Sequence, residues 1–378
     1  MLLEALLPME SKNRTISTSP WRGVSSKEWH DWEWQYGNRI RTIRQLAAVL
    51  NKTPAALKKC GTVARFYPFS VTPYYLSLMD TEDEDDPLRL QSFPDEREID
   101  FSLGGVADPL EEERDMPVSG LVHRYRDRCV TIVTNRCATY CRHCNRKRIW
   151  KKGGSGNGEN TGYLERMVDY VAKTKHIREV IVSGGDPLTV KDSILDWFLG
   201  SLRSIPHVDV LRIGSRMPVV MPMKITRELC NMLRKHRPVW FNTQFNHPNE
   251  ITPEAARACE MILEAGIPVS NQSVLLRGIN DNYKTLRDLF YGLQRISVRP
   301  YYLFQCDPVK GTDHFRTDVR SGIKIMKRIW GNISGLCVPQ YIFDIPGGKG
   351  KYPLYPGSPF RAMASRKKDI FDSEGEVN

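Results

Sequence analysis

The chain has 378 residues, of which 40% are hydrophobic, and this is enough for one barrel-sized catalytic domain with additional elements. It contains no run near the ~18 apolar residues of a membrane-spanning helix, and nine irregularly spaced cysteines are not typical of a secreted disulfide framework. We therefore expect a cytoplasmic protein without a membrane partner. The net charge of +11 is scattered along the sequence, which favours attraction of anionic cofactors over a nucleic-acid partner.

Residues 1–120 are expected to form an N-terminal helical region that serves packing and subunit contacts. Within it, residues 26–60 begin with serines that can cap a helix and continue with apolar side chains at helical spacing, namely Trp29, Trp32, Ile40, Ile43 and Leu46. The acidic stretch at 80–91 is predicted to be a solvated connection.

From residue 129 onward, β-rich runs alternate with helix-like stretches. The runs are 129–135, 179–185, 209–215, 238–246, 268–276, 299–306 and 340–346. This alternation predicts a parallel sheet with crossover helices, and six or more such units without a dinucleotide fingerprint indicate a full or partial barrel. We expect an α/β fold, namely a partial TIM-type (β/α)6-like barrel over residues 121–356 with a short C-terminal tail at 357–378. Polar residues at the strand ends are then the functional candidates: Asn135, Ser183–Asp186, Ser215–Arg216, Asn242–Asn246 and Asp307.

Cys137, Cys141 and Cys144 follow the first of these strands with the spacing Cys-x3-Cys-x2-Cys. Structural zinc is one interpretation, but it needs four ligands, and the available His143 is squeezed between two of the cysteines. A [4Fe–4S] cluster fits better, because three cysteines leave one iron open for a substrate or cofactor. This spacing after a first barrel strand resembles the radical S-adenosylmethionine (SAM) enzymes, in which the open iron holds the methionine part of SAM.

Two basic segments suggest a second cofactor. "HRYRDR" (123–128) precedes the first strand with three arginines, and "FDIPGGKGKYPLYP" near the C-terminus holds lysines on a glycine-rich turn. Arginines suit a phosphate and such a lysine can form a Schiff base with pyridoxal phosphate (PLP), although a solvated turn and a surface loop are the simpler interpretations.

Taken together, these features resemble lysine 2,3-aminomutase and its relatives nearly end to end. The matching stretches include "WHDWEWQYGNRI", "GLVHRYRDR", "CATYCRHCNRKR", "VSGGDPL", "RIGSRMPVV", "NQSVLLRGIND", "RPYYLFQCD" and "PGGKGK". The resemblance implies an isomerase that moves the α-amino group of an amino acid to C3. It also implies an electron donor such as flavodoxin or ferredoxin, and a homo-oligomer, although no cysteine follows Cys337 to supply the family's intersubunit zinc site.

The same resemblance implies the cofactor contacts. The cluster would be bound by Cys137, Cys141 and Cys144, and SAM would be surrounded by His143, Ser183, Gly184, Gly185, Asp186 and Gln272. Gln244 stands where a histidine is expected, which leaves a SAM contact there open. Lys351 would carry PLP by gap-free alignment from Pro346, although Lys349 takes the place of a glycine in the motif. Arg124 and Arg128 would face the PLP phosphate, with Tyr125 beside the ring.

Substrate choice is implied by three further residues. Arg146 would pair with the substrate carboxylate, and Asp307 and Asp344 would hold a distal ammonium. The substrate would then be L-lysine, which gives β-lysine, and not glutamate. Lys310 and Phe304 depart from the family pattern near that end, and they keep arginine, which would give β-arginine, as the alternative. A radical SAM enzyme that modifies RNA or protein stays open as a different class.

Overall fold

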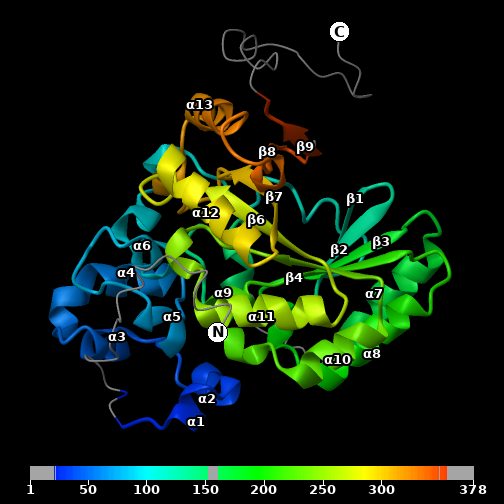
Figure 1. The fold of residues 1–378 in the computed structure, drawn as a ribbon, viewed down its shortest axis with the longest axis horizontal. Helices are drawn as coiled ribbons and strands as arrows, with labels where there is room; N and C mark the ends of the chain where they lie inside the picture. Colours follow the sequence, from blue (N-terminus) through cyan, green and yellow to red (C-terminus); the bar gives the residue numbers. More distant parts are fainter. Residues whose placement is uncertain (1–20, 22, 152–160, 349, 356–378) are drawn as a thin grey trace.

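The computed structural model describes residues 21, 23–151, 161–348 and 350–355. One sheet dominates it, with nine strands in the order β1 to β9 (Figure 1). The strands are β1 Leu121–Tyr125, β2 Arg128–Ile132, β3 Glu179–Ser183, β4 Val210–Gly214, β5 Val239–Thr243, β6 Val269–Leu275, β7 Arg299–Gln305, β8 Gln340–Ile345 and β9 Gly350–Pro353. Every pair from β2 to β8 is parallel, and the outer pairs β1–β2 and β8–β9 are antiparallel. The α/β fold with a partial barrel is thus confirmed.

All seven predicted runs became strands β2 to β8, whereas β1 and β9 were missed. The basic segment 123–128, predicted to precede the first strand, contains the end of β1, which pairs back on β2. Gly350–Pro353 was read as part of a flexible turn, but it pairs with β8, with Lys351 opposite Asp344. Both are edge strands whose polar side chains carry no clear two-residue alternation, so the pattern did not reveal them.

Helices of two groups surround the sheet. The N-terminal group, at the left of Figure 1, comprises α1 Ser26–Trp29, α2 Trp32–Gly37, α3 Ile43–Val49, α4 Lys58–Phe66, α5 Pro73–Ser77 and α6 Pro87–Ser92, with 3-10 turns η1 Pro54–Leu57, η2 Glu96–Ile99 and η3 Phe101–Leu103. Side chains cap these short helices, among them Ser25, Asp31, Thr42 and Thr72, as the sequence predicted for the first of them.

The prediction of a solvated connection at 80–91 is wrong for its second half. Asp86 is buried and caps α6 by accepting from the backbone amides of Leu88 and Arg89. Leu88 and Gln91 on the same helix are fully buried. The run of acids before Asp86 obscured a capping residue, because charge alone does not separate a solvated acid from a cap.

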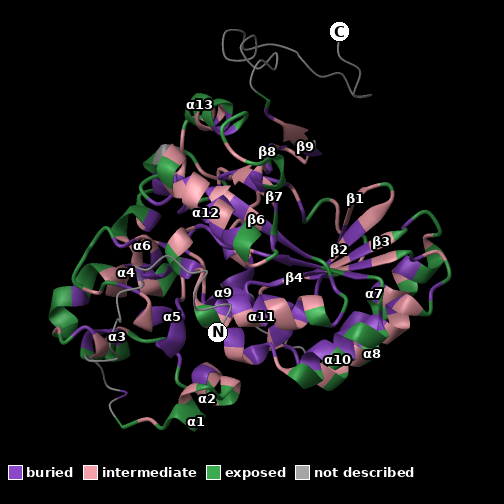
Figure 2. Cartoon of the chain, viewed as in Figure 1, coloured by how far each residue is buried: buried purple, intermediate pink, exposed green. Residues whose placement is uncertain are grey.

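The crossover helices cover the outside of the sheet. The longer ones are α7 Thr161–Lys173, α8 Asp192–Arg203, α10 Arg227–Lys235, α11 Pro253–Glu264, α12 Tyr283–Arg295 and α13 Val319–Ile329. The short elements are α9 Met217–Val220, η4 Lys147–Lys151, η5 Pro187–Thr189, η6 Pro222–Lys224, η7 Pro248–Glu250, η8 Asp313–Phe315 and η9 Gly335–Cys337. Buried residues follow the central strands and the helix faces that pack on them (Figure 2).

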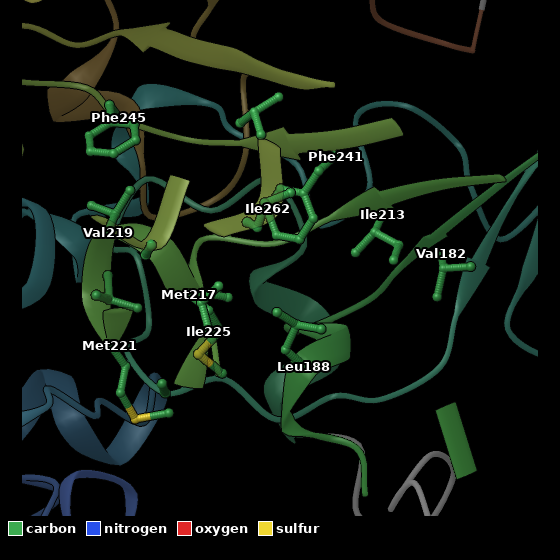
Figure 3. Close-up of a cluster of buried hydrophobic side chains, with 14 of the residues drawn as sticks. Val182, Leu188, Ile213, Met217, Val219, Met221, Ile225, Phe241, Phe245 and Ile262 are labelled. Carbon is green, nitrogen blue, oxygen red and sulfur yellow. The ribbon is translucent and has the colours of Figure 1, made fainter. Parts of the chain in front are cut away.

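The alternation along the central strands separates core from cavity. On β3 and β4, fully buried Val180, Val182, Leu211 and Ile213 alternate with residues that keep partial exposure. Val182 and Ile213 belong to the hydrophobic cluster in Figure 3, with Leu188, Met217 and Phe241. Because neighbouring side chains on a strand point to opposite faces, the partly exposed residues face the interior of the barrel. None of the helices in the described parts of the chain is long and apolar enough to cross a bilayer.

Candidate active site

A cavity of about 420 Å³ lies inside the curved sheet. Every strand from β1 to β9 contributes at least one lining residue, and the loops after β2 and β3 contribute more. All the residues predicted to contact a cofactor or the substrate line this one cavity: Arg124, Tyr125, Arg128, Cys137, Cys141, His143, Cys144, Arg146, Ser183, Gly184, Gly185, Asp186, Gln272, Asp307, Asp344 and Lys351. Of the strand-end candidates, Asn135 and Asn246 are not among the residues that line it. Residues far apart in the sequence, such as Arg124 and Lys351, therefore meet around one cavity.

The three cysteines of the loop after β2 are free thiols at one end of the cavity. Burial raises the pKa of Cys144 to about 11 and that of Cys137 well above its ordinary value. Arg216 Nη1 donates to Cys141 Sγ at 2.8 Å, and the Arg146 amide donates to Cys144 Sγ at 3.3 Å. Buried thiolates of this kind need a cationic partner, and an iron–sulfur core supplies one.

A single metal ion is a poorer fit to these residues. In the described ranges, no three His, Cys, Asp or Glu side chains come close enough together to hold one ion. A cubane cluster accepts wider spacing, because each thiolate binds a different iron. The chemistry of the donors therefore fits the [4Fe–4S] cluster.

The cysteine loop is fastened to the N-terminal region by a buried ion triad. Glu98 accepts from Arg142 Nε at 2.9 Å and Nη2 at 2.6 Å, and from Lys147 Nζ at 2.7 Å. The exposed fraction of these three side chains is at most 1%. Arg142 and Lys147 flank Cys144, so Glu98 holds the loop on both sides of this thiol. This role of Glu98 could not be inferred from the sequence, in which Glu98 is one acidic residue among many.

A second buried network orients Arg216 toward Cys141. Arg216 Nη2 donates to Glu250 at 2.6 Å, to Gln91 at 2.7 Å and to Tyr75 at 3.2 Å. Tyr75 also donates to Glu250, at 2.6 Å. Arg216 was noted only as a polar residue at a strand end, and its partners on the N-terminal helices α5 and α6 could not be inferred from sequence.

His143 lines the cavity and has one ring nitrogen without a hydrogen-bond partner among the described residues. Its Nε2 accepts from Asn246 Nδ2 at 3.3 Å and lies 3.4 Å from Gln244 Nε2, so the proton belongs on Nδ1. That Nδ1 is buried and has no partner among the described residues. Burial, with Arg216 and Lys147 nearby, lowers the pKa of His143 well below its ordinary value. The ring is therefore a neutral donor available to a polar ligand.

The "SGGD" segment, residues 183–186, packs against the cysteine loop and the end of β4. Gly184 has φ +131, and a side chain there would collide with the Thr134 carbonyl, while one at Gly185 would collide with Arg136. Asp186 accepts from Ser215 Oγ at 2.8 Å and from the Arg216 amide at 2.9 Å. Burial raises the pKa of Asp186 to about 6. These contacts join the ends of β3 and β4 to the cysteine loop. Ser183 and Gln272 line the cavity beside them.

At the opposite end, Lys351 lies on β9 next to the acid that faces it in the sheet. Its Nζ is 2.8 Å from Asp344 Oδ2, and its amide donates to Tyr125 Oη at 3.1 Å. Arg128 stacks over the Tyr125 ring at 3.9 Å. Lys349, the other lysine of the motif, lies outside the described residues.

Arg124 is already engaged by acids. Its Nε donates to Asp115 at 2.9 Å, its Nη2 donates to the Leu110 carbonyl, and its Nη1 lies 3.9 Å from Asp344 Oδ1. Asp344 is buried, and its Oδ1 has no hydrogen-bond partner within the described chain. A group that donates to Asp344 would satisfy this oxygen.

Asp307 and Asp344 form an acid pair at this end. Burial, reinforced by Asp344, raises the pKa of Asp307 to about 7. Lys351 and a hydrogen bond from Asn145 act in the opposite direction. Two carboxylates whose charges oppose each other favour a cation between them.

Lys310 does not lie where the sequence suggested. Its Nζ sits over the Phe101 ring at 4.1 Å, its side chain is exposed, and it is not among the residues that line the cavity. The glycine that follows, Gly311, has φ +83 and packs against Glu98 and Tyr67, which turns the chain away from the cavity. Phe304 does line the cavity, so only one of the two departures can shape it.

Comparison with known proteins places this geometry in context. Residues 131–290 match the model of the radical SAM superfamily. The chain is 46% identical over 335 residues to the L-lysine 2,3-aminomutase of Clostridium subterminale, covering 89% of this chain and 80% of that protein. It is 47% identical over 336 residues to the L-lysine 2,3-aminomutase of Acetoanaerobium sticklandii, covering 88% and 80%. It is also 43% identical over 332 residues to the glutamate 2,3-aminomutase of Clostridioides difficile, covering 88% and 78%.

Proposed function

The chain belongs to the lysine 2,3-aminomutase family of radical SAM isomerases, and from this premise we propose that it moves the α-amino group of a cationic amino acid to C3. L-Lysine, giving β-lysine, is the first candidate. When bound, the cluster with SAM supplies a 5′-deoxyadenosyl radical that abstracts hydrogen, and PLP supplies an aromatic system through which the amino group can migrate. The residues of the chain bind and orient the reactants and keep water out.

The acid pair is the observation that carries the choice of substrate. Lys351 Nζ pairs with Asp344 at 2.8 Å, and Asp307 beside them has a pKa of about 7. Lys351 cannot both pair with Asp344 and carry PLP. Its commitment to PLP leaves two carboxylates that require another cation, and the distal ammonium of lysine meets that need. Glutamate would place a third carboxylate there.

The other contacts follow from the lining of the cavity. Arg146 would bind the substrate carboxylate, because a guanidinium can grip a carboxylate with two hydrogen bonds. The Nδ1 of His143, with Ser183, Gly184, Gly185, Asp186 and Gln272, would surround SAM. Arg128 and Arg124 would stand at the PLP phosphate, and the Tyr125 ring, already stacked under Arg128, would lie beside the pyridine ring.

Lysine ranks above arginine for a reason of geometry. Lys310 is one of the two residues that depart from the family pattern and that could make room for the longer side chain of arginine. Its ammonium lies over the Phe101 ring, and the residue does not line the cavity. Phe304 alone is left to reshape the pocket. A compact ammonium fits between two carboxylates without any such change.

Anaerobic incubation of the reconstituted enzyme with lysine, arginine and glutamate tests the proposal, with the β-isomers measured by mass spectrometry. We expect lysine to be preferred, and Asp307→Asn or Asp344→Asn to weaken that preference by about one to two orders of magnitude. Asp318→Asn is the matched control, because Asp318 is an exposed helix cap that Asn can replace. A wild-type preference for glutamate, or no change in either variant, contradicts the assignment.

The identity of the PLP lysine is tested separately. Borohydride reduction of the PLP-loaded enzyme followed by peptide mapping should place the adduct on Lys351. An adduct on Lys349 would show that the alignment from Pro346 is shifted by two residues. The proposed chemistry would then hold, but the lysine that pairs with Asp344 would not be the one that carries PLP.

The setting of the enzyme completes the proposal. All nine cysteines are free, which supports a reducing compartment such as the cytoplasm. Flavodoxin or ferredoxin would donate the electron, and the chain would assemble as a homo-oligomer. Light scattering on the purified protein tests the assembly, and a monomer at working concentration would count against it.

A further inference from the structure

Residues 105–116, which we call the Glu112 segment, connect the N-terminal helices to β1 and were read from sequence as packing elements. In the structure this segment borders the cavity, which Leu110 and Glu112 line. Its first part is bound to the loop that carries Asp307, since the Val106 amide donates to the Pro308 carbonyl at 3.0 Å and the Lys310 amide donates to Val106 at 2.9 Å.

The same segment touches two more parts of the site. The Gly347 amide, in the turn before Lys351, donates to the Pro109 carbonyl at 2.9 Å. Asp115, near the end of the segment, accepts from Arg124. Glu112, between them, lines the cavity and contacts Arg146. One segment thus binds the loops and side chains assigned to both PLP and substrate.

Glu112 grips one particular edge of Arg146. Its carboxylate accepts from Arg146 Nε at 3.0 Å and from Nη2 at 2.7 Å. These two nitrogens lie on the same side of the guanidinium, so the plane of the group is fixed. The opposite nitrogen, Nη1, lies 3.4 Å from Ser183 Oγ, which also lines the cavity. The end of the guanidinium formed by Nη1 and Nη2 is therefore turned toward the cavity.

We propose that Glu112 is a positioning residue that holds Arg146 with this end presented to the substrate carboxylate. The inference rests on the proposed function, because it takes Arg146 as the carboxylate ligand. Glu112 limits the rotamers of a long side chain before the substrate arrives, and a group held in advance loses less entropy on binding.

A purely structural ion pair is the competing explanation, and two features favour positioning. Arg148 also binds Glu112, at 2.7 Å, but it has Asp108 at 3.3 Å and Glu113 at 3.6 Å as further acids. Among the described residues, Glu112 is the one acid within ion-pair distance of Arg146. Glu112 is also kept ionised, since Arg146 and Arg148 outweigh its burial and lower its pKa to about 2.

The first experiment needs no substrate. An arginine-specific dicarbonyl such as phenylglyoxal is applied to wild type, Glu112→Gln and Glu113→Gln, each loaded with its cofactors, and the rate of modification at Arg146 is read by peptide mass spectrometry. We expect faster modification in Glu112→Gln and the wild-type rate in Glu113→Gln. Glu113→Gln is the matched control, because it removes the same charge from the next residue, which forms an ion pair with Arg148. Equal rates in wild type and Glu112→Gln overturn the proposal, whatever the substrate is.

The second experiment measures binding by titration calorimetry on PLP-loaded enzyme without SAM. L-Lysine is compared with L-lysinamide, which lacks the carboxylate. We expect wild type to favour lysine, and Glu112→Gln to reduce that ratio by roughly tenfold to a hundredfold, with lysinamide binding unchanged. Glu112→Asp, which keeps the charge on a shorter arm, should fall between them and serves if Glu112→Gln folds poorly. In an Arg146→Met background, Glu112→Gln should have no further effect.

The two experiments separate the possible failures. If the labelling rate changes but wild type binds lysine and lysinamide equally, Arg146 is not the carboxylate ligand and that part of the proposed function is wrong, while Glu112 still positions Arg146. If Glu112→Gln weakens lysine and lysinamide alike, or acts equally in the Arg146→Met background, Glu112 has only a structural role and the inference is wrong.

Discussion

At the scale of single residues, the hydrogen bond from Arg216 to Cys141 has a consequence for electron transfer. Hydrogen bonds to cluster sulfurs and nearby positive charge stabilise the more negative, reduced state and so raise the reduction potential. Arg216 Nη1 lies 2.8 Å from Cys141 Sγ, while Nη2 is used by Glu250 and Gln91. The planar, forked guanidinium makes both sets of contacts at once, which a lysine cannot do.

Arg216→Lys should therefore lower the reduction potential of the cluster while keeping a cation beside Glu250. An EPR-monitored redox titration of the reconstituted protein measures this, with iron content as a check on assembly. Arg212→Lys is the control, because Arg212 lines the same cavity but pairs with Glu179. If Arg216→Lys keeps its iron and its reduction potential is unchanged, Arg216 does not tune the cluster. An equal shift of the potential in Arg212→Lys would lead to the same conclusion.

The acid pair predicts a pH dependence of substrate binding. Asp307 has a pKa of about 7 and faces Asp344, Lys351 and Glu112. A bound cation favours the ionised carboxylate, so binding below pH 7 requires Asp307 to lose its proton. Lysine affinity should fall as the pH decreases below about 7, by up to about tenfold per unit, and should level off above it.

Calorimetry in buffers of different ionisation enthalpy counts the protons released on binding. Asp307→Asn should remove both the proton release and the slope. Burial raises the pKa of Asp186, another acid of the cavity, to about 6, and Asp186→Asn separates its contribution. A slope that survives Asp307→Asn would assign the titration elsewhere.

At the scale of elements, the cysteine loop depends on an acid in another part of the chain. Glu98 on η2 neutralises Arg142 and Lys147, and all three side chains are almost fully buried. Removing one partner of a buried ion pair leaves an uncompensated charge, which costs about 3–5 kcal/mol. Here two cations would lose their partner.

Glu98→Gln should lower the free energy of unfolding by about 3–5 kcal/mol and reduce the iron retained after reconstitution. Glu96→Gln is the matched control on the same turn, because Glu96 makes an exposed pair with Lys59 and its loss should leave the free energy of unfolding almost unchanged. Denaturant unfolding and iron analysis provide the two measurements. Equal stability of the two variants would show that the triad is not what fastens the loop.

The elements also show what the sequence could and could not reveal. Strands β2 to β8 were predictable because each is a short β-rich run, and the runs alternate with helical patterns. The contacts of the cysteine loop were not predictable, because they are long-range: Arg142 meets Glu98, 44 residues away, and Arg216 meets Gln91, 125 residues away. Local periodicity contains no information about which distant acid pairs with which base.

At the scale of the whole molecule, motif resemblance predicted the residues that contact a cofactor or the substrate, and the structure places all of them around one cavity. The sequence did not reveal which partners these side chains contact before ligands bind. Arg146 is engaged by Glu112, Arg124 by Asp115 and Lys351 by Asp344. Each cationic group assigned to a ligand is thus paired with an acid of the chain itself, which keeps the charges of the cavity compensated.

The two edges of the sheet meet at the proposed PLP site through a side chain. The Lys351 amide on β9 donates to Tyr125 Oη on β1 at 3.1 Å, and the preceding Gly350 has φ +98, a backbone conformation that favours glycine. Tyr125 therefore links the first strand to the last, where the sheet has no backbone pairing. Because this link fixes Lys351, losing it should weaken PLP retention more than it weakens the fold.

Tyr125→Phe removes only the hydroxyl and keeps the ring under Arg128. A neutral hydrogen bond contributes about 0.5–1.5 kcal/mol, so PLP affinity should fall by roughly twofold to tenfold, with the melting temperature almost unchanged. Titration of PLP absorbance against the apoenzyme measures the affinity. Tyr170→Phe is the control, because Tyr170 also reaches β1, at His123 Nδ1, but not the cavity. If Tyr125→Phe binds PLP as tightly as wild type, or if Tyr170→Phe loses as much affinity, the hydrogen bond between Tyr125 and the Lys351 amide does not position Lys351.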